Sequence, residues 1–232
     1  REKPDVSCRA AIRVVGGGAI RISGNHLSDL GPIQAHLGYV AGIELVVPFT
    51  LTNIADNSIT RTPVGDVIGS AWIAIRVVQP TAAAAARVKH GYAGAALLVA
   101  EKGAFLLTGT RLHALILTPA DSTSVRGNQI MARGCLVPLV QLQGALTTLF
   151  TDNHCEAEPA AATQFAPAIV DLREGAIIAS NNRVRWTSND HDAIHISASK
   201  AFTVLGNITM GNIRVDGAPL PAPWAPLNIL AS

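Results

Sequence analysis

Asparagine recurs at one position of a repeated sequence pattern, and this recurrence limits the possible folds more than any other feature. Each copy is a short run of alternating apolar and polar residues that ends in a two-residue turn. The second turn residue is Asn25, Asn57, Asn128, Asn153, Asn182 or Asn207, and the first is Gly24, Asp56, Gly127, Asp152, Asn181 or Gly206. Gly, Asp and Asn tolerate the left-handed backbone of tight turns. The pattern therefore predicts the same strand and turn six times.

A second apolar pair precedes each of these six turns by about 13 residues and predicts another strand in each copy. The pairs are Ile12 and Val14, Ile43 and Leu45, Leu115 and Leu117, Val140 and Leu142, and Ile194 and Ile196, with Val170 and Leu172 in the copy that ends at Asn182. Leu97 and Val99, followed by Phe105 and Leu107, predict a further copy that has lost its Asn. Residues 72–78 (WIAIRVV) predict the strand of one more, degenerate copy. With these copies the period is about 26 residues.

Short strands at such a period predict an all-β chain of stacked parallel strands, because one copy cannot bury its apolar face alone. The chain has 232 residues, of which 49% are hydrophobic and only 4% aromatic, which suits a narrow interior of Ile, Val, Leu and Ala. We expect one domain over 1–232. It would have a lead-in at 1–10, repeats over 11–215 and a proline-rich cap at 216–232, where the repeat pattern stops.

These turns and strand pairs resemble right-handed parallel β-helix proteins, the architecture of pectate-lyase-like enzymes and many phage tailspikes. The resemblance implies a solenoid of roughly seven to eight rungs, and it implies that the six asparagines form a structural ladder. Stacked side-chain amides can donate to and accept from one another along the axis. One fold hosts many activities, so the resemblance indicates architecture far more than function.

Outward positions on the first strand of each copy are where such proteins bind substrate. They are predicted to be Arg13, Glu44, Leu98, Ile116, Gln141, Asp171 and His195, with Gln143, Arg173 and Ser197 further along. Leu98 and Ile116 facing outward would indicate a covering loop or partner chain. We therefore expect other protein chains as partners, with a homotrimer as the specific prediction. Gln141, Gln143 and Arg173 are the candidate ligand-binding residues.

Asp171, His195 and Asp192 are the candidate catalytic residues. Asp171 and His195 are predicted to be neighbours on adjacent copies, and the loop at 188–193 adds Asp190, His191 and Asp192. A carboxylate can orient an imidazole, and two carboxylates can divide acid and base roles in glycoside cleavage. The alternative interpretation is a solvated polar surface. Lyases of this architecture use calcium held by several acids, so calcium is expected only if the chain is such an enzyme.

Other functional classes have little support in the sequence. The net charge of +2 with scattered Lys and Arg does not indicate nucleic-acid binding, and no stretch is long and apolar enough to predict a membrane span. Three cysteines, Cys8, Cys135 and Cys155, lack the spacing of a zinc site or a disulfide framework, and their redox state stays open. His154, Glu156 and Glu158 would share one side of a strand, but no second ligand cluster supports a metal.

The sequence therefore predicts a non-catalytic structural or adhesive module of a larger extracellular, cell-surface or particle-associated assembly, without a cofactor. The alternative is a polysaccharide lyase or glycoside hydrolase with a groove along the first sheet. Whether the chain is an enzyme is left open at this stage, with the structural role favoured.

Overall fold

The computed structural model describes residues 10–28, 40–61, 72–78, 95–100, 103–108, 111–115, 120–135, 138–159, 168–186, 192–198 and 201–231. Strands make up most of these residues, and the single helical element among them is the 3-10 turn η1 (Ala225–Leu227). Nearly all strands of the two large sheets pair in parallel. The expectation of an all-β chain built from parallel strands is confirmed.

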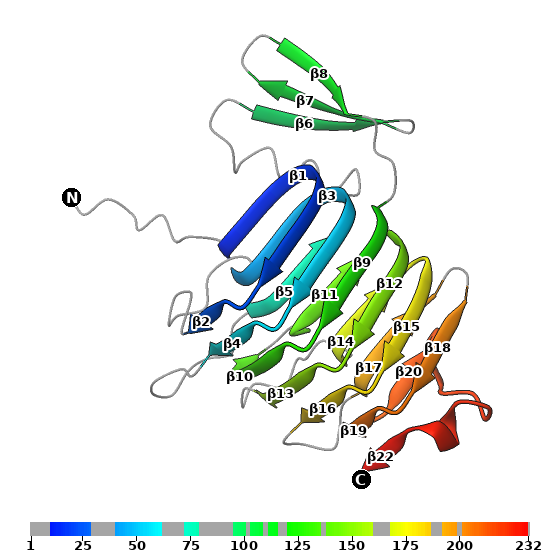
Figure 1. Cartoon of the computed structure of the whole chain (residues 1–232). Helices are drawn as coiled ribbons and strands as arrows, with labels where there is room; N and C mark the ends of the chain where they lie inside the picture. The colour runs from blue at the N-terminus through cyan, green and yellow to red at the C-terminus, as the bar shows by residue number, and fades with distance from the viewer. Residues whose placement is uncertain are drawn as a thin grey trace.

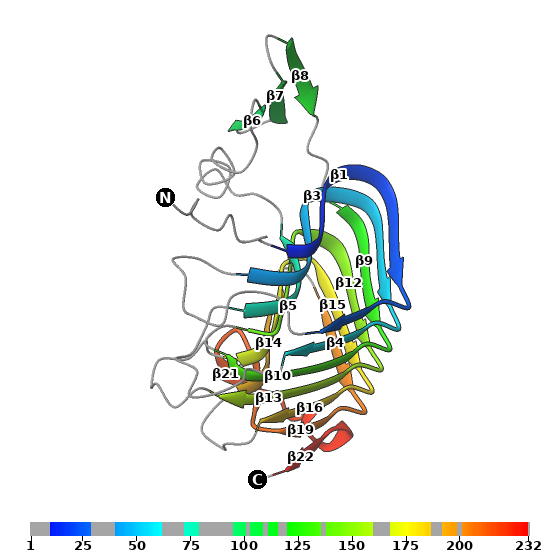
Figure 2. The same ribbon diagram turned by 90° about the vertical axis from the view of Figure 1, so that its left-hand side faces the viewer.

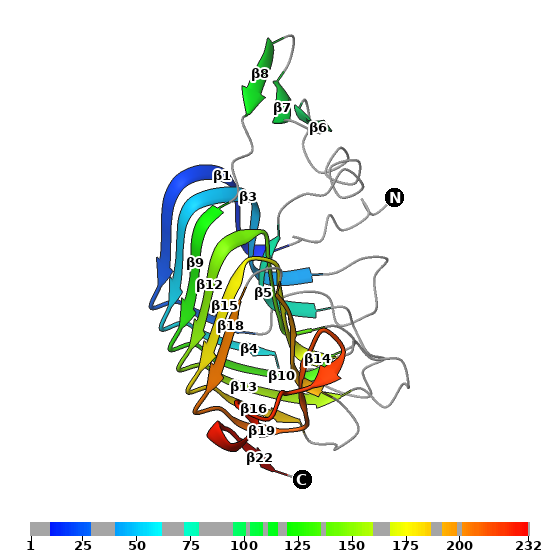
Figure 3. The same ribbon diagram turned by 90° about the vertical axis from the view of Figure 1, so that its right-hand side faces the viewer.

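The twelve-stranded sheet has two arms, which share the long strands β1 (Ala10–Ser23) and β3 (Val40–Ala55). Both strands curve from one arm into the other, as the views from the two sides show (Figure 2 and Figure 3). The first arm continues through β5 (Trp72–Val78), β11 (Val140–Gln143), β14 (Ala168–Arg173), β17 (Asp192–Ser197), β20 (Ile213–Val215) and β21 (Ala218–Pro219). The second arm continues through β9 (Ala120–Arg126), β12 (Ala145–Thr151), β15 (Ala176–Ser180) and β18 (Phe202–Leu205).

A seven-stranded parallel sheet forms the third side of the molecule. Its strands, in spatial order, are β2 (His26–Ser28), β4 (Ser58–Arg61), β10 (Gln129–Cys135), β13 (His154–Pro159), β16 (Arg183–Trp186), β19 (Ile208–Met210) and β22 (Ile229–Ala231).

The chain runs through these three sides in the same order each time. We call one such set of three consecutive strands a layer. One layer is β11, β12 and β13, and each of its strands pairs in parallel with the equivalent strand of the next layer, β14, β15 and β16. The described residues form seven such layers, the last incomplete, stacked from β1 to β22 (Figure 1).

Asparagine side chains hydrogen-bond the layers together at the turn between the second arm and the seven-stranded sheet. At Asn153, Oδ1 accepts from the backbone N–H (3.1 Å) and Nδ2 (3.0 Å) of Asn128. Its own Nδ2 donates to Val125 O (2.9 Å) and to Oδ1 of Asn182 (3.1 Å). The residue before each of the six predicted asparagines has positive φ, for example 57° at Asp152. All six lie in this one continuous row.

Asn228 extends the row by one more residue, which the sequence reasoning missed. Asn207 donates to Asn228 Oδ1 (2.8 Å), and Asn228 Nδ2 donates to Val204 O (3.0 Å) and Trp224 O (2.8 Å). Thus the segment predicted as a cap at 216–232 first forms β21, which pairs antiparallel with β20, and then re-enters the stack through β22.

The prediction of two copies between Asn57 and Asn128 is wrong. The backbone N–H and Nδ2 of Asn57 both donate to Oδ1 of Asn128 (3.1 and 2.9 Å), so the two turns belong to neighbouring layers. Leu97, Val99, Phe105 and Leu107 lie instead in a separate antiparallel sheet of β6 (Ala95–Ala100), β7 (Gly103–Thr108) and β8 (Arg111–Leu115) (Figure 1). That sheet pairs with no described strand of the two large sheets.

The first strand of the layer that ends at Asn128 is β5 and not the segment around Leu115 and Leu117. Ile75 and Val77 pair with Val140 and Leu142 of the next layer. Leu115 ends β8, and Leu117 lies outside the described residues.

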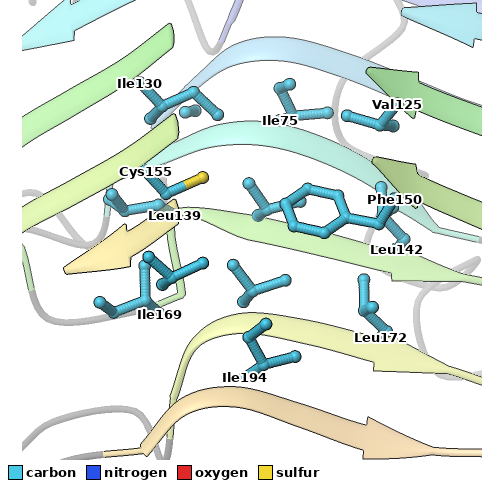
Figure 4. Packing of buried hydrophobic residues seen from close by; sticks show 14 of the residues in the cluster. Ile75, Val125, Ile130, Leu139, Leu142, Phe150, Cys155, Ile169, Leu172 and Ile194 are labelled. Atoms are coloured by element: carbon cyan, nitrogen blue, oxygen red, sulfur yellow. The ribbon is translucent and has the colours of Figure 1, made fainter. Parts of the chain in front are cut away.

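The interior is a stack of aliphatic side chains that the alternation places on the inner side of each strand. Figure 4 shows Ile75, Leu142, Leu172 and Ile194 packed layer upon layer. Each is fully buried, and full burial of such a side chain contributes about 1.5–3 kcal/mol. In the part of the chain that the structure describes, no helix has the length and apolar character to cross a membrane.

Candidate functional site

One row of side chains on the outer side of the first arm contains most of the predicted site residues. Cross-strand pairing places one residue of each layer in this polar row. Its members are Arg13, Glu44, Arg76, Gln141, Asp171, His195 and Arg214. Neighbouring strands are about 4.8 Å apart, so each polar group can reach the next.

The apolar middle predicted for this row is absent from the described residues, because Glu44, Arg76 and Gln141 follow one another directly in the register. Leu98 lies in β6 of the separate antiparallel sheet, and Ile116 lies outside the described residues. Their place is taken by Arg76 of β5, which pairs with Glu44 and Gln141. The sequence of residues 72–78, WIAIRVV, could have identified Arg76, since Arg76 is the single charged residue in an otherwise apolar strand.

Glu44 shows how the polar row satisfies a buried charge. Its side chain is 0% exposed, and Arg13 Nε lies 2.9 Å from Oε2 while Arg76 Nη1 lies 3.0 Å from Oε1. Arg76 also donates from Nε to Gln141 Oε1 (3.2 Å). An unpaired carboxylate would be too costly to bury. Glu44 therefore has an arginine partner on either side.

Asp171 is the second buried carboxylate of the row, and its side chain is 1% exposed. Arg173 binds it through two hydrogen bonds, from Nε to Oδ1 (3.0 Å) and from Nη2 to Oδ2 (2.8 Å). This bond raises the pKa of the Arg173 guanidinium. The ring nitrogen Nδ1 of His195 lies 3.1 Å from Asp171 Oδ1. Because a carboxylate only accepts, Nδ1 is the donor in this contact.

Asp192 belongs to a different contact from that of Asp171 and His195. Arg214 Nε lies 2.8 and 2.9 Å from its two carboxylate oxygens. A β-bulge explains how Asp192 reaches this side of the sheet. The backbone N–H groups of Ala193 and Ile194 both donate to Asn212 O (2.7 and 3.3 Å), and both side chains are fully buried. Two consecutive inward residues leave Asp192 on the outer side.

The remaining candidates are also engaged. Gln143 donates to Glu174 Oε1 (2.7 Å) at the exposed edge of the first arm, next to Arg173. On β13, His154 Nε2 lies 3.9 Å from Glu156, whereas Glu158 pairs with Arg133 at 2.9 Å. The described residues hold no group of three His, Cys, Asp or Glu side chains that could bind a metal ion. Asp190, His191 and Cys8 lie outside the described residues.

The structure thus brings together two of the three predicted catalytic residues. A histidine oriented by a carboxylate can act as a general base. Here, however, Arg173 also binds both oxygens of Asp171, and Arg214 binds the second candidate carboxylate, Asp192. Acid and base roles need a carboxyl group that a substrate can reach, and the oxygens of both carboxylates are already occupied by arginine donors. Sequence reasoning missed Arg76 and Arg214 because it counted two copies too many in the middle and stopped at His195.

No protein-family model, characterised protein or solved structure was found to match this chain.

Proposed function

We propose that the chain is a right-handed parallel β-helix that serves as a non-catalytic structural or adhesive module of a larger assembly. The observation that carries this proposal is the state of the carboxylates in the polar row. Glu44 is buried and bound by arginines of both neighbouring layers, so it links three layers across their strands. Asp171 is buried too, where Arg173 of its own strand and His195 of the next layer bind it. The extracellular, cell-surface or particle-associated location is part of the proposal and rests on the resemblance to β-helix proteins.

The Asn row supports a rigid module. Each internal asparagine donates to and accepts from its neighbours while its amide also binds a backbone carbonyl, as at Asn182 with Phe150 O (2.8 Å). A continuous stack with fully satisfied buried amides can move little within itself. Rigidity along the stack suits a shaft or a platform that holds other chains at fixed spacing.

The second candidate function is polysaccharide cleavage, which the contact between Asp171 and His195 favours. In that case His195 would act as general base and Asp171 would position its ring, with Asp192 as the further acid. Calcium binding to Asp171 or Asp192 would have to displace an arginine. The ion pairs of both carboxylates therefore weigh against this function.

The test measures turnover on a panel of acidic and neutral polysaccharides, with and without added calcium. The variants are His195→Gln and the matched control His154→Gln, whose histidine is exposed on the outer side of the seven-stranded sheet. The structural proposal predicts equal background readings for the three proteins. Turnover by the natural sequence that His195→Gln abolishes and His154→Gln retains would establish the enzyme instead.

Asp171→Asn separates the two functions by a second readout. Under the structural proposal it weakens two charge-assisted hydrogen bonds to Arg173, which should lower the free energy of unfolding by about 2 kcal/mol. If the chain is an enzyme, Asp171→Asn should instead abolish turnover. Unchanged stability together with lost turnover would contradict the structural role of Asp171.

A further inference from the structure

The first asparagine of the Asn row differs from the others in what its side chain accepts. In each of the six later turns, Oδ1 accepts from the backbone N–H and from Nδ2 of the asparagine one layer before. Asn57, for example, accepts both bonds from Asn25, at 3.0 and 2.9 Å. Among the described residues, none donates to Oδ1 of Asn25 itself. The row therefore begins with an unused acceptor.

The backbone beside Asn25 has a matching unused donor. In each later layer, the N–H of the residue that follows the asparagine donates to the backbone carbonyl of the asparagine one layer before. Ser58 donates in this way to Asn25 O (2.8 Å), and Gln129 donates to Asn57 O (2.9 Å). His26 is the equivalent residue of the first layer, and its N–H has no acceptor in the part of the chain that the structure describes.

The apolar interior also lacks cover on this side, as far as the described residues show. Ile12 and Leu27 are only partly buried, whereas their register partners in the second layer, Ile43 and Ile59, are fully buried. The edge strand β1 is 14 residues long, and a long edge strand offers its free N–H and C=O groups to another strand. One more parallel layer would satisfy both the backbone and the interior.

The opposite end of the Asn row is closed by the chain itself. Figure 1 shows β1 and β2 at one end of the stack and β22 at the other. The backbone N–H of Asn228 donates to Ala225 O (3.2 Å), and one of its Nδ2 bonds goes to Trp224 O (2.8 Å). In the six preceding turns these two groups donate to the next asparagine instead. A second copy therefore does not fit Asn25, because its last asparagine has no free donor and its first offers another acceptor.

We propose that the outer edge of the first layer, formed by β1, the turn at Asn25 and β2, binds a strand–turn–strand segment of a partner protein. The segment runs parallel to the first layer and carries asparagine at the same turn position. The N–H and Nδ2 of that asparagine donate to Asn25 Oδ1, and its backbone carbonyl accepts from the His26 N–H. Strand addition at a free sheet edge is a common mode of recognition between proteins.

The hydrogen bonds specify this partner more narrowly than the apolar surface does. Any extended strand could pair with β1, but only a turn residue with a side-chain amide can repeat the contact that joins all adjacent turns of the row. The proposal identifies the partner of the structural module proposed above and rests on that function.

The first test is amide hydrogen exchange of the full chain, followed by NMR. The His26 amide should exchange rapidly, whereas the equivalent amides of Ser58 and Gln129 should be protected, because theirs are hydrogen-bonded between layers. A protected His26 amide in the chain alone would show that the edge is already covered and would overturn the proposal.

The second test adds a synthetic peptide of residues 145–159 with Cys155→Ser, which contains β12, the turn at Asn153 and β13. At about 1 mM peptide, a range suited to a weak single contact, the His26 amide should become protected. The same peptide with Asn153→Ala keeps the backbone N–H but loses the Nδ2 donor. It should bind about fivefold more weakly, which corresponds to one hydrogen bond.

Changes in the chain test the same contact from the other side. Asn25→Ala removes the acceptor of both bonds and should weaken peptide binding about thirtyfold. Asn212→Ala is the matched control, because this exposed asparagine lies at the other end of the stack, and it should bind as the natural sequence does. Circular dichroism checks that both variants fold, and the Asn153→Ala peptide tests the contact without altering the chain.

Two results of the peptide experiments would overturn the proposal. One is a His26 amide that the peptide leaves unprotected, and the other is equal binding of the natural and Asn153→Ala peptides. None of these measurements involves turnover, so the proposed function and the proposed partner fail separately.

Discussion

Replacing Asn153 with Ala should destabilise the chain far more than the same change at Asn25, because the two occupy different places in the Asn row. Asn153→Ala removes four hydrogen bonds: two accepted by Oδ1 and two donated by Nδ2. It also leaves the buried backbone N–H of Asn128 without its acceptor. At about 0.5–1.5 kcal/mol for each bond, the loss is about 4 kcal/mol.

Asn25→Ala is the matched control at the first layer. It removes two bonds donated by Nδ2, to Ser23 O (3.3 Å) and to Asn57 Oδ1 (2.9 Å), at a half-buried position where water can replace them. The expected loss is about 1 kcal/mol. Urea unfolding followed by circular dichroism and tryptophan fluorescence measures both variants. Equal losses, or a loss below about 1 kcal/mol at Asn153, would refute the structural reasoning.

Asn153→Asp tests the direction of the hydrogen bonds at the same site through pH. One carboxyl oxygen can accept as before, but the other would face two acceptors, Val125 O and Asn182 Oδ1. The folded state must therefore keep the proton, which raises the pKa of the new carboxyl above its ordinary value of about 3.9. Stability is then full below pH 4 and falls as pH rises toward 7. A variant that follows the natural pH profile would contradict this assignment.

Three further changes probe the interior. Thr148 is fully buried and its Oγ1 has no hydrogen-bond partner, so Thr148→Val should raise the unfolding free energy by about 1 kcal/mol, whereas Thr147→Val on the outer side should not. Gly175 and Gly24 both have φ +69°, but a Cβ at Gly175 would meet backbone carbonyls of the preceding layer and one at Gly24 would meet nothing. In thermal melts, Gly175→Ala should therefore cost several times the ~1 kcal/mol of Gly24→Ala. Burial raises the pKa of Cys155 to about 12, so in a variant whose other cysteines are serine this thiol should react with a disulfide reagent at pH 8 only after unfolding.

Local signals were sufficient to predict the strands and turns of the layers that follow one another directly along the chain. A run of alternating apolar and polar residues that ends in an Asn turn predicts the same strand wherever it occurs. The pairs at Val140, Val170 and Ile194 are buried as this alternation predicts. The order of the layers is not local. Nothing in the spacing shows that Asn57 contacts Asn128 across 71 residues, because an inserted sheet and an extra layer lengthen the chain equally.

The candidate site was predictable only in part for the same reason. Asp171 and His195 sit in consecutive layers with intact turns, so counting along the chain placed them side by side. Asp192 depended on a bulge, which breaks the alternation by which outward residues are identified. Asn228 was hidden because the prolines around it suggested that the stack had ended.

The distribution of charge over the three outer sides indicates which of them is free to bind. The arginines of the first arm are committed to Glu44, Asp171 and Asp192, so another chain could use that side only by breaking existing ion pairs. The seven-stranded sheet pairs Arg133 with Glu158 and exposes further charged residues to water. The second arm exposes Leu51 and Leu205, whose register partners are uncharged, and it also carries Arg21 and Arg126. Covering the two leucines would remove apolar surface from water and would break no ion pair among the described residues. The sequence predicted a partner from outward apolar side chains, but it placed those side chains on the first arm because Leu98 and Ile116 were counted there.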